Sequence, residues 1–324
     1  MTKQSAPLTV EVVLCSYNGS RYITEQLASI TSQTWPVDRV SVYDDGSSDG
    51  TQALVRQFAA TATISVVLVE NPINLGYANN FAQALQKASA DIVFFSDQDD
   101  IWLPTKVAAM APLFKDASCV MAFSDGQLVD DKGILIEGPS VLSGHGLAPR
   151  DVERFETYAW DRLLRGNVIN GAAMAVRRTA AVAGLPIPPE FPHDYWLALW
   201  LSRPGKIIGI PQVLYSYRLH QNNLIGTRRP PLRHRLYSML KNPAAPRHQD
   251  LQRTRALVDR LPDDARLADS MEKLRWLGKV ASESTPVFIR LAHIAISALC
   301  GKYRKFGTAD AMLRDLATLG RRGL

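Results

Sequence analysis

The chain has 324 residues, 46% of them hydrophobic and 21% charged, an ordinary composition for a globular protein that buries a sizeable core. The N-terminus lacks the apolar segment of a signal peptide, and no uncharged apolar run reaches the ~18 residues of a spanning helix, so we expect neither. Cys15, Cys119 and Cys300 are widely spaced and form no CxxC pair, which favours reduced thiols in a cytosolic protein over disulfides.

Charge is divided unevenly along the chain. Residues 1–227 contain 17 Lys and Arg against 22 Asp and Glu, a net charge of −5, whereas residues 228–324 contain 20 against 9, a net charge of +11. Such asymmetry predicts that the C-terminal part meets an anionic partner, either a membrane surface or a nucleic acid.

The first hundred residues alternate between two patterns. Short runs rich in β-branched residues predict strands, and amphipathic runs between them predict helices. The strands are expected at 9–15, 40–45, 64–70 and 91–97, and the helices at 20–33, 51–60 and 78–89. This alternation predicts βαβ units: an α/β, Rossmann-like, mostly parallel sheet with helices on both faces.

The pattern becomes less regular from residue 120. We expect a strand and irregular chain after 120, a strand over 167–178, a helix over 193–203 and two short strands within 207–220. Residues 227–231 (TRRPP) resemble a linker, and the pattern of residues 232–324 is helical and basic. We therefore divide the chain into a catalytic domain at 1–227 and a basic helical C-terminal extension at 228–324.

Polar clusters come after each predicted strand of the first half. The most acidic is SDQDDIW (96–102), in which Asp97, Asp99 and Asp100 come directly after the apolar run 92–95. In open α/β sheets, ligands bind beyond the carboxyl ends of the strands. Packed carboxylates need a counter-cation, and hard oxygen ligands suit Mg²⁺ or Mn²⁺. The alternative is a solvated turn or a helix cap.

Several segments together resemble the family 2 glycosyltransferases of the GT-A fold. They occur in the family's order within residues 9–226, and the forms SDQDDIW and YRLHQNN particularly resemble bacterial rhamnosyltransferases that build O-antigen and related cell-wall polysaccharides. The matching segments are VVLCSYNGSRYITEQLASITSQTWP (12–36), DDGSSDGT (44–51), NLGYANNF (74–81), SDQDDIW (96–102), NGAAM (170–174), HDYW (193–196) and YRLHQNN (217–223).

The resemblance implies a nucleotide-diphospho-sugar donor and a divalent metal, Mg²⁺ or Mn²⁺. Asp99 would be the metal ligand, His220 would complete the metal or diphosphate site, and Arg218 would neutralise the diphosphate. Asp44 or Asp45 would read the pyrimidine base. The remaining donor-side residues would be Ser16, Tyr17, Asn18, Asn74, Asn79, Asp97, Gln98 and Trp102, although the asparagines also suit turns and caps, and Trp102 also suits the core.

The resemblance further implies an inverting transfer with Asp194 as the general base that takes the acceptor's hydroxyl proton. Asp194 also stands where a helix cap would. The family more often has Glu-Asp where this chain has His193-Asp194. Asn170, Gly171 and His193 are expected on the acceptor side, where a glycine would allow close approach of a sugar, or equally tight packing.

The apolar segment 285–300, with GKYRKF directly after it, predicts either a core helix or a helix in a membrane interface. We expect a lipid-linked oligosaccharide or polysaccharide acceptor, an anionic membrane partner, no nucleic acid, and a peripheral location on the inner face of the plasma membrane. The donor is expected to be dTDP-L-rhamnose, with a UDP-hexose as the alternative. An inactive nucleotide-sugar-binding scaffold is the alternative of another class.

Overall fold

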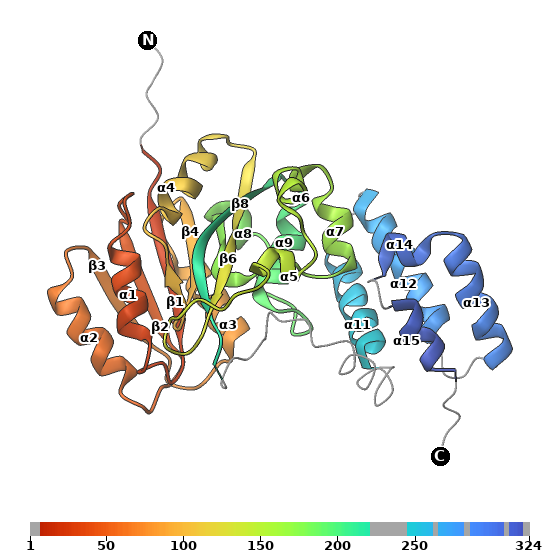
Figure 1. The fold of residues 1–324 in the computed structure, drawn as a ribbon, viewed down its shortest axis with the longest axis horizontal. Helices are drawn as coiled ribbons and strands as arrows, with labels where there is room; N and C mark the ends of the chain where they lie inside the picture. The colour runs from red at the N-terminus through yellow and green to blue at the C-terminus, as the bar shows by residue number, and fades with distance from the viewer. Residues whose placement is uncertain (1–6, 221–244, 262–264, 282–285, 308–310, 320–324) are drawn as a thin grey trace, which may run out of the picture. The chain divides into compact units, whose positions relative to one another are not determined.

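The computed structural model describes residues 7–220, 245–261, 265–281, 286–307 and 311–319. The chain forms two compact units (Figure 1). The sheet unit comprises Met1–Ala159, Val168–Ile187 and Pro192–Arg228, and the helical unit comprises Trp160–Asn167, Pro188–Phe191 and Arg229–Leu324. The predicted linker at 227–231 lies outside the described residues.

The sheet unit is built on one mixed sheet of eight strands in the order β3-β2-β1-β4-β7-β6-β8-β5. The first three strands and β4 are mutually parallel, β7 is antiparallel to both of its neighbours, and β8 is parallel to β6. The strands are β1 (Val10–Ser16), β2 (Arg39–Asp44), β3 (Ser65–Glu70), β4 (Ile92–Asp97), β5 (Ile101–Trp102), β6 (Cys119–Val129), β7 (Met174–Arg177) and β8 (Lys206–Arg218).

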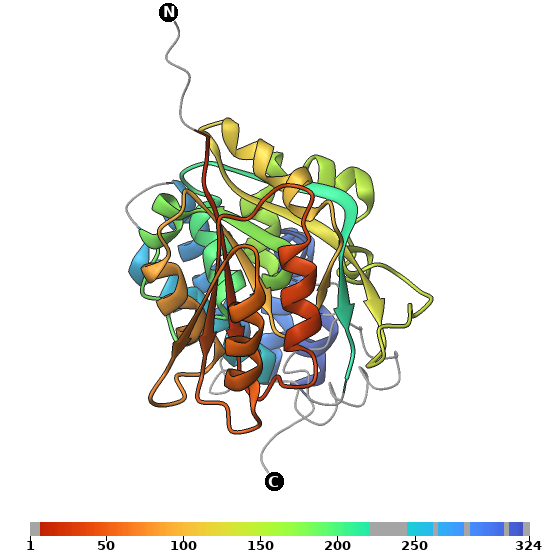
Figure 2. The ribbon, with the colours of Figure 1, turned by 90° about the vertical axis from the view of Figure 1, so that its left-hand side faces the viewer.

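Side-chain alternation along the parallel strands directs apolar residues to both faces. On one face, Leu14 of β1 joins a core cluster with Leu27 of α1 (Ile23–Thr31) and Val55 of α2 (Thr51–Thr61). Figure 2 shows α1 and α2 in front of the strands. On the other face, Phe95 of β4 packs on Phe81 of α3 (Tyr77–Lys87), with ring centroids 5.6 Å apart. The predicted α/β fold with flanking helices is confirmed.

Shorter helices and 3-10 turns complete the sheet unit around α9. They are α4 (Lys106–Met110), η1 (Ala111–Lys115), α5 (Val141–Gly144), α6 (Pro149–Glu153), η2 (Phe155–Thr157), η3 (Gly171–Ala173), α8 (Arg178–Val182) and α9 (His193–Leu201).

Two predicted elements differ in the structure. The expected strand at 167–178 is a strand only over Met174–Arg177, because Gly171–Ala173 form a 3-10 turn in which Asn170 Oδ1 accepts a hydrogen bond from Ala172 N. The two strands expected within 207–220 are one long strand, β8. Its pairing with β6 skips Pro211 and Gln212 at a register shift, so the strand continues past the proline through a bulge.

The helical unit contains helices α11 (Ala245–Arg260), α12 (Ala265–Ala281), α13 (Val287–Leu299), α14 (Lys302–Phe306) and α15 (Ala311–Ala317), with most of α7 (Ala159–Arg165). Trp276 of α12 packs against Tyr303 and Phe306 of α14, with ring centroids 5.3 and 6.0 Å apart. The buried ammonium of Lys273 donates a hydrogen bond to Leu164 O. The predicted helical C-terminal region is therefore confirmed. Among the described helices, none is long and apolar enough to span a bilayer.

Candidate active site at the carboxyl ends of the strands

Strand register brings the predicted donor-side residues to one edge of the sheet. Ser16 pairs with Asp44, and Cys15 pairs with Asp97. Ser16 Oγ donates a hydrogen bond of 2.9 Å to Asp44 Oδ2. Asn18 comes next with a positive φ of 50°, and its side-chain oxygen accepts a 2.9 Å bond from Ser48 N. The β1–α1 and β2–α2 loops are therefore tied together beyond the strand ends.

The two carboxylates proposed for base recognition differ in how many hydrogen bonds they already accept. Asp44 accepts four: from the backbone and hydroxyl of Ser47, from Gln52 Nε2 and from Ser16 Oγ. Because a carboxylate has about four lone-pair sites, Asp44 is saturated. Asp45 accepts three, from Asn71 Nδ2, Leu75 N and Gly76 N, and its Oδ2 takes only the last. Asp45 therefore retains acceptor capacity.

Gln98 holds the aromatic loop after β1. Its Oε1 accepts a 2.8 Å bond from Tyr17 N, and its Nε2 donates a 3.0 Å bond to Tyr17 O. A Cβ at Gly19 would lie 2.1 Å from Gln98 Oε1, so only glycine admits this side chain. The Tyr17 side chain remains 51% exposed, which leaves its ring accessible to a planar ligand.

Three carboxylates gather where β4 ends. Burial beside the charges of Asp99 and Asp194 raises the pKa of Asp97 to about 7. Asp100 is buried, and burial together with Asp99 and Asp97 raises the pKa of its carboxyl well above the usual range. Its Oδ1 accepts a 3.2 Å bond from Arg218 N, whereas Oδ2 is buried without a hydrogen-bond partner. Such unfavourably placed like charges are typical of functional sites.

Asp99 and His220, 121 residues apart in the chain, are in contact at the predicted metal site. His220 Nε2 lies 2.8 Å from Asp99 Oδ2, and the imidazole stacks on Tyr22 with centroids 5.2 Å apart. Two neighbouring ligands of an octahedral Mg²⁺, each about 2.1 Å from the ion, would be about 3 Å apart. The pair therefore fits a divalent ion. Within the described ranges there is no group of three or more His, Cys, Asp or Glu arranged for a metal, so water and substrate phosphates would complete the shell.

Arg218, expected to meet a diphosphate, is buried within the protein. Its guanidinium donates 2.6 Å to Glu25 Oε2 and 2.8 Å to Asp99 O, and lies over the Tyr22 ring at 4.6 Å. Since its backbone N–H also bonds to Asp100, Arg218 joins the end of β8 to the acidic loop and to α1. The structure thus gives Arg218 a positioning contact with Asp99.

Lys106 is a site residue that the sequence interpretation missed. Its side chain is fully buried, its ammonium donates to Ala172 O, and Nζ lies 4.0 Å from the centre of the Trp102 ring. Burial lowers the pKa of Lys106 to about 7, while the carboxylates of Asp100 and Asp97 oppose that shift. Lys106 is the cation that faces the acidic loop from inside. The sequence signal that could have identified Lys106 is a lysine directly followed by the apolar residues of α4.

Asp194 lies in the first turn of α9, close enough for its charge to raise the pKa of Asp97. Its Oδ1 accepts a 2.6 Å bond from Tyr195 N, which resembles the cap alternative, although the residue that precedes the helix is Pro192. The structure therefore brings the proposed base to the acidic loop.

His193 is buried and stacks on Phe81, with centroids 4.0 Å apart. Neither of its ring nitrogens has a hydrogen-bond partner, and burial lowers the pKa of His193 to about 3. A Cβ at Gly171 would lie 2.6 Å from His193 Nε2, so this glycine allows tight packing. Asn170 precedes this glycine and caps the 3-10 turn Gly171–Ala173.

Three further predicted residues make local contacts. Asn74 donates to Asp45 O, and Asn79 of α3 donates to Leu75 O in the loop before that helix. The Trp102 indole lies in the core, 2% exposed, against Phe94. The sequence interpretation also missed Asn80, which is buried, donates to Tyr43 O and accepts from Asn71. These contacts place the asparagines around Asp45.

Comparison with known proteins agrees with this geometry. Residues 11–181 match the family model described as glycosyl transferase family 2. TuaG of Bacillus subtilis strain 168, assigned to teichuronic acid biosynthesis, is 26% identical over 219 residues, covering 66% of this chain and 81% of its own. The Escherichia coli UDP-Glc:alpha-D-GlcNAc-diphosphoundecaprenol beta-1,3-glucosyltransferase WfgD is 24% identical over 245 residues, covering 73% and 88%.

A solved structure has the same fold. The mannosyltransferase PcManGT from Pyrobaculum calidifontis, in complex with GDP-Man and Mn²⁺, superposes with a TM-score of 0.59 at 18% identity, covering 97% of this chain and 86% of its own. The fold and the acidic edge thus define a glycosyltransferase of the GT-A fold that uses a nucleotide-sugar donor. The chain belongs to glycosyl transferase family 2.

Proposed function

We propose that the chain is an inverting glycosyltransferase whose favoured donor is dTDP-L-rhamnose. Its acceptor is a lipid-linked or surface polysaccharide on the inner face of the plasma membrane. The observation that carries this proposal is the contact of Asp99 with His220 beside Asp97, at the edge that Asp194 also reaches. A UDP-hexose donor is the second candidate, favoured by the relative WfgD, whose name specifies UDP-glucose and a diphosphoundecaprenol-linked acceptor.

On the donor side, the Tyr17 ring is exposed for stacking on the base, with Ser16 and Asn18 holding its loop. Asp45 is the better candidate to accept the imide N–H of a pyrimidine, because Asp44 is saturated by the protein itself. Asp99 and His220 would hold the divalent cation, which when bound stabilises negative charge on the phosphate oxygens of the departing nucleoside diphosphate. We assign Arg218 to positioning Asp99, and we leave Trp102 in the core.

On the acceptor side, Asp194 takes the proton from the acceptor hydroxyl as that oxygen bonds to the anomeric carbon. The bond between the anomeric carbon and the phosphate oxygen breaks, and the nucleoside diphosphate leaves with the electron pair. His193, the first residue of α9, packs against Gly171, and this contact positions the neighbouring Asp194. Inversion results from a single displacement at the anomeric carbon.

The test is calorimetric binding of dTDP-rhamnose and a panel of UDP-sugars, each with and without Mn²⁺ or Mg²⁺. We expect metal-dependent binding of one donor, weakened at least about tenfold in Asp99→Ala, since loss of a group that merely supports a metal ligand already costs 10–100-fold. Asp38→Ala, at the opposite end of β1, is the matched control. Absence of binding to every donor in the panel, with or without metal, would refute the proposal.

A further inference from the structure

Helix α13 of the helical unit buries polar residues and exposes most of its large apolar ones, the opposite of a typical surface helix. Arg290, Ile294 and Ser297 are buried on its inner side, and an Arg290 nitrogen donates a 2.5 Å bond to Thr318 Oγ1. The exposed side carries apolar residues at helical spacing, with Phe288 at 72% and Leu299 at 88% exposure. Leu291 and Ile296 complete that stripe.

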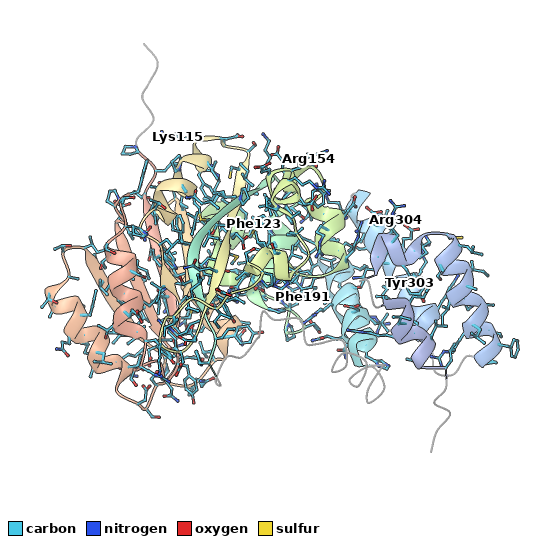
Figure 3. All side chains as sticks on the ribbon, in the orientation of Figure 1. Lys115, Phe123, Arg154, Phe191, Tyr303 and Arg304 are labelled. Atoms are coloured by element: carbon cyan, nitrogen blue, oxygen red, sulfur yellow. The ribbon has the colours of Figure 1, made fainter. Side chains whose placement is uncertain are left out.

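Helix α15, which packs against α13, repeats the arrangement. Its buried side carries Asp315, whose carboxylate accepts a 2.6 Å bond from Tyr303 Oη. Its exposed side carries Met312, Leu313 and Leu316. Figure 3 shows Tyr303 among the helices of this unit and Arg304 at their edge. Clustered exposed apolar side chains are typical of interaction surfaces.

The positive charge of residues 286–307 and 311–319 favours an anionic partner for the exposed apolar surface. Within residues 286–307 and 311–319, the only acidic side chain is the buried Asp315, whereas five are basic: Arg290, Lys302, Arg304, Lys305 and Arg314. Arg304 is exposed, while Lys302 and Lys305 pair with Glu272. Arg304 and Arg314 form no ion pair among the described residues, so a symmetric contact between two copies would bring these two unneutralised cations of one copy near those of the other. An anionic bilayer supplies both an apolar interior and negative headgroups.

We propose that the outward face of α13 and α15, defined by Phe288, Leu291, Ile296, Leu299, Met312, Leu313 and Leu316, docks on an anionic lipid bilayer. At 13 residues, α13 is about 20 Å long, too short to cross a hydrocarbon core of about 30 Å but suited to lie in its interface. The inference deepens the part of the proposed function that places the acceptor at a membrane, and it names the surface that reaches it.

The test is co-sedimentation of the full chain with vesicles of phosphatidylcholine alone or mixed equally with phosphatidylglycerol. We expect binding to the mixed vesicles, at least about tenfold weaker in the Leu291→Ser/Leu299→Ser double variant. Arg304→Gln, which removes one positive charge, should weaken binding severalfold. The matched control is Ile134→Ser/Leu135→Ser, which changes two exposed apolar residues of the sheet unit.

The proposal would be overturned if the wild-type protein did not bind the mixed vesicles, or if the double variant bound them as tightly as the wild type. Loss of a concentration-dependent dimer in the double variant, without vesicle binding by either protein, would assign the surface to a second copy instead. The assay contains no sugar nucleotide, so its failure leaves donor binding by the sheet unit untouched, and failure of the donor assay leaves vesicle binding untouched.

Discussion

Charged groups at two of the places where the chain buries them have different surroundings. At the end of β4, the buried Asp100 lies near the half-buried Asp97 and Asp99, and Asp100 Oδ2 has no hydrogen-bond partner. In the helical unit, buried Arg290 and Asp315 each bond to a neutral hydroxyl of the same unit, although Nε of Arg290 has no hydrogen-bond partner. Charges that a chain stabilises internally serve as scaffold, whereas charges that it leaves in mutual repulsion indicate a ligand from outside.

The same contrast extends to the helices. Helix α1 buries Ile23, Leu27 and Ile30 together with Gln26, and its other polar residues are exposed or half-buried, as is usual for a helix at a protein surface. Helix α13 turns its apolar stripe outward. The sheet unit therefore holds its ligand site among buried polar groups, and the helical unit carries its candidate interaction surface on exposed apolar ones.

The largest effect is expected from substitution of the proposed base in the sheet unit. Asp194→Asn should lower turnover by about 10²–10⁴-fold, because the acceptor proton loses its carboxylate, while donor affinity is kept. Glycosyl transfer and calorimetry on the same preparation measure both, with Glu153→Gln, an exposed acid of the same unit, as the control. Unchanged turnover would leave Asp194 as a helix-terminal residue. A wild type that binds donor without turnover would favour the scaffold.

Removing the internal cation should have the next largest effect. Lys106→Met leaves Asp97 and Asp100 without the buried ammonium and Ala172 O without a donor, and should cost about 3 kcal/mol of unfolding free energy. Denaturant unfolding measures it. Lys115→Met, at an exposed lysine of the neighbouring turn η1 (Figure 3), should change stability by no more than about 0.5 kcal/mol. Equal effects of the two variants would contradict the role of Lys106.

The repulsion at β4 should also give stability a pH dependence. The pKa of Asp97 is raised in the folded protein, from 3.8 to about 7, so the folded state binds more protons than the unfolded state between these values. Wild-type stability should fall as pH rises from about 4 to 7, and Asp97→Asn should remove about 3 kcal/mol of that fall. Thermal melts without divalent cations, compared with Asp91→Asn at the start of β4, measure it. Parallel pH profiles would exclude the repulsion.

The smallest effect is expected on the outward side of α13. Leu299→Ser should change the unfolding free energy by no more than about 0.5 kcal/mol, since the side chain is already exposed. Ile294→Ala on the inward side of the same helix should cost about 2 kcal/mol or more. Denaturant titration of both variants measures the difference. A cost for Leu299→Ser equal to that of Ile294→Ala would mean that the outward side is covered within the protein.

Much of the sheet unit could be predicted because its signals are local. Strand–helix alternation gave the parallel half of the sheet, and the polar clusters after the strands identified the edge at which Ser16, Asp44 and Asp97 meet. The pairing of Arg218 with Glu25 could not be predicted, because it joins residues 193 positions apart. Nor could the orientation of α13, since periodicity tells which residues share a side of a helix but not which side faces the protein.

The carboxamide of Gln98 has a consequence for engineering. Gln98 precedes Asp99 in the chain, and its side chain bonds to both the N–H and the C=O of Tyr17. It therefore links the acidic loop directly to the loop proposed to stack the base. A displacement of one loop is thereby passed on to the other. If Tyr17 and Asp99 have the proposed roles, redesign of the nucleotide preference through Tyr17 would also alter metal affinity, and the two properties would have to be optimised together.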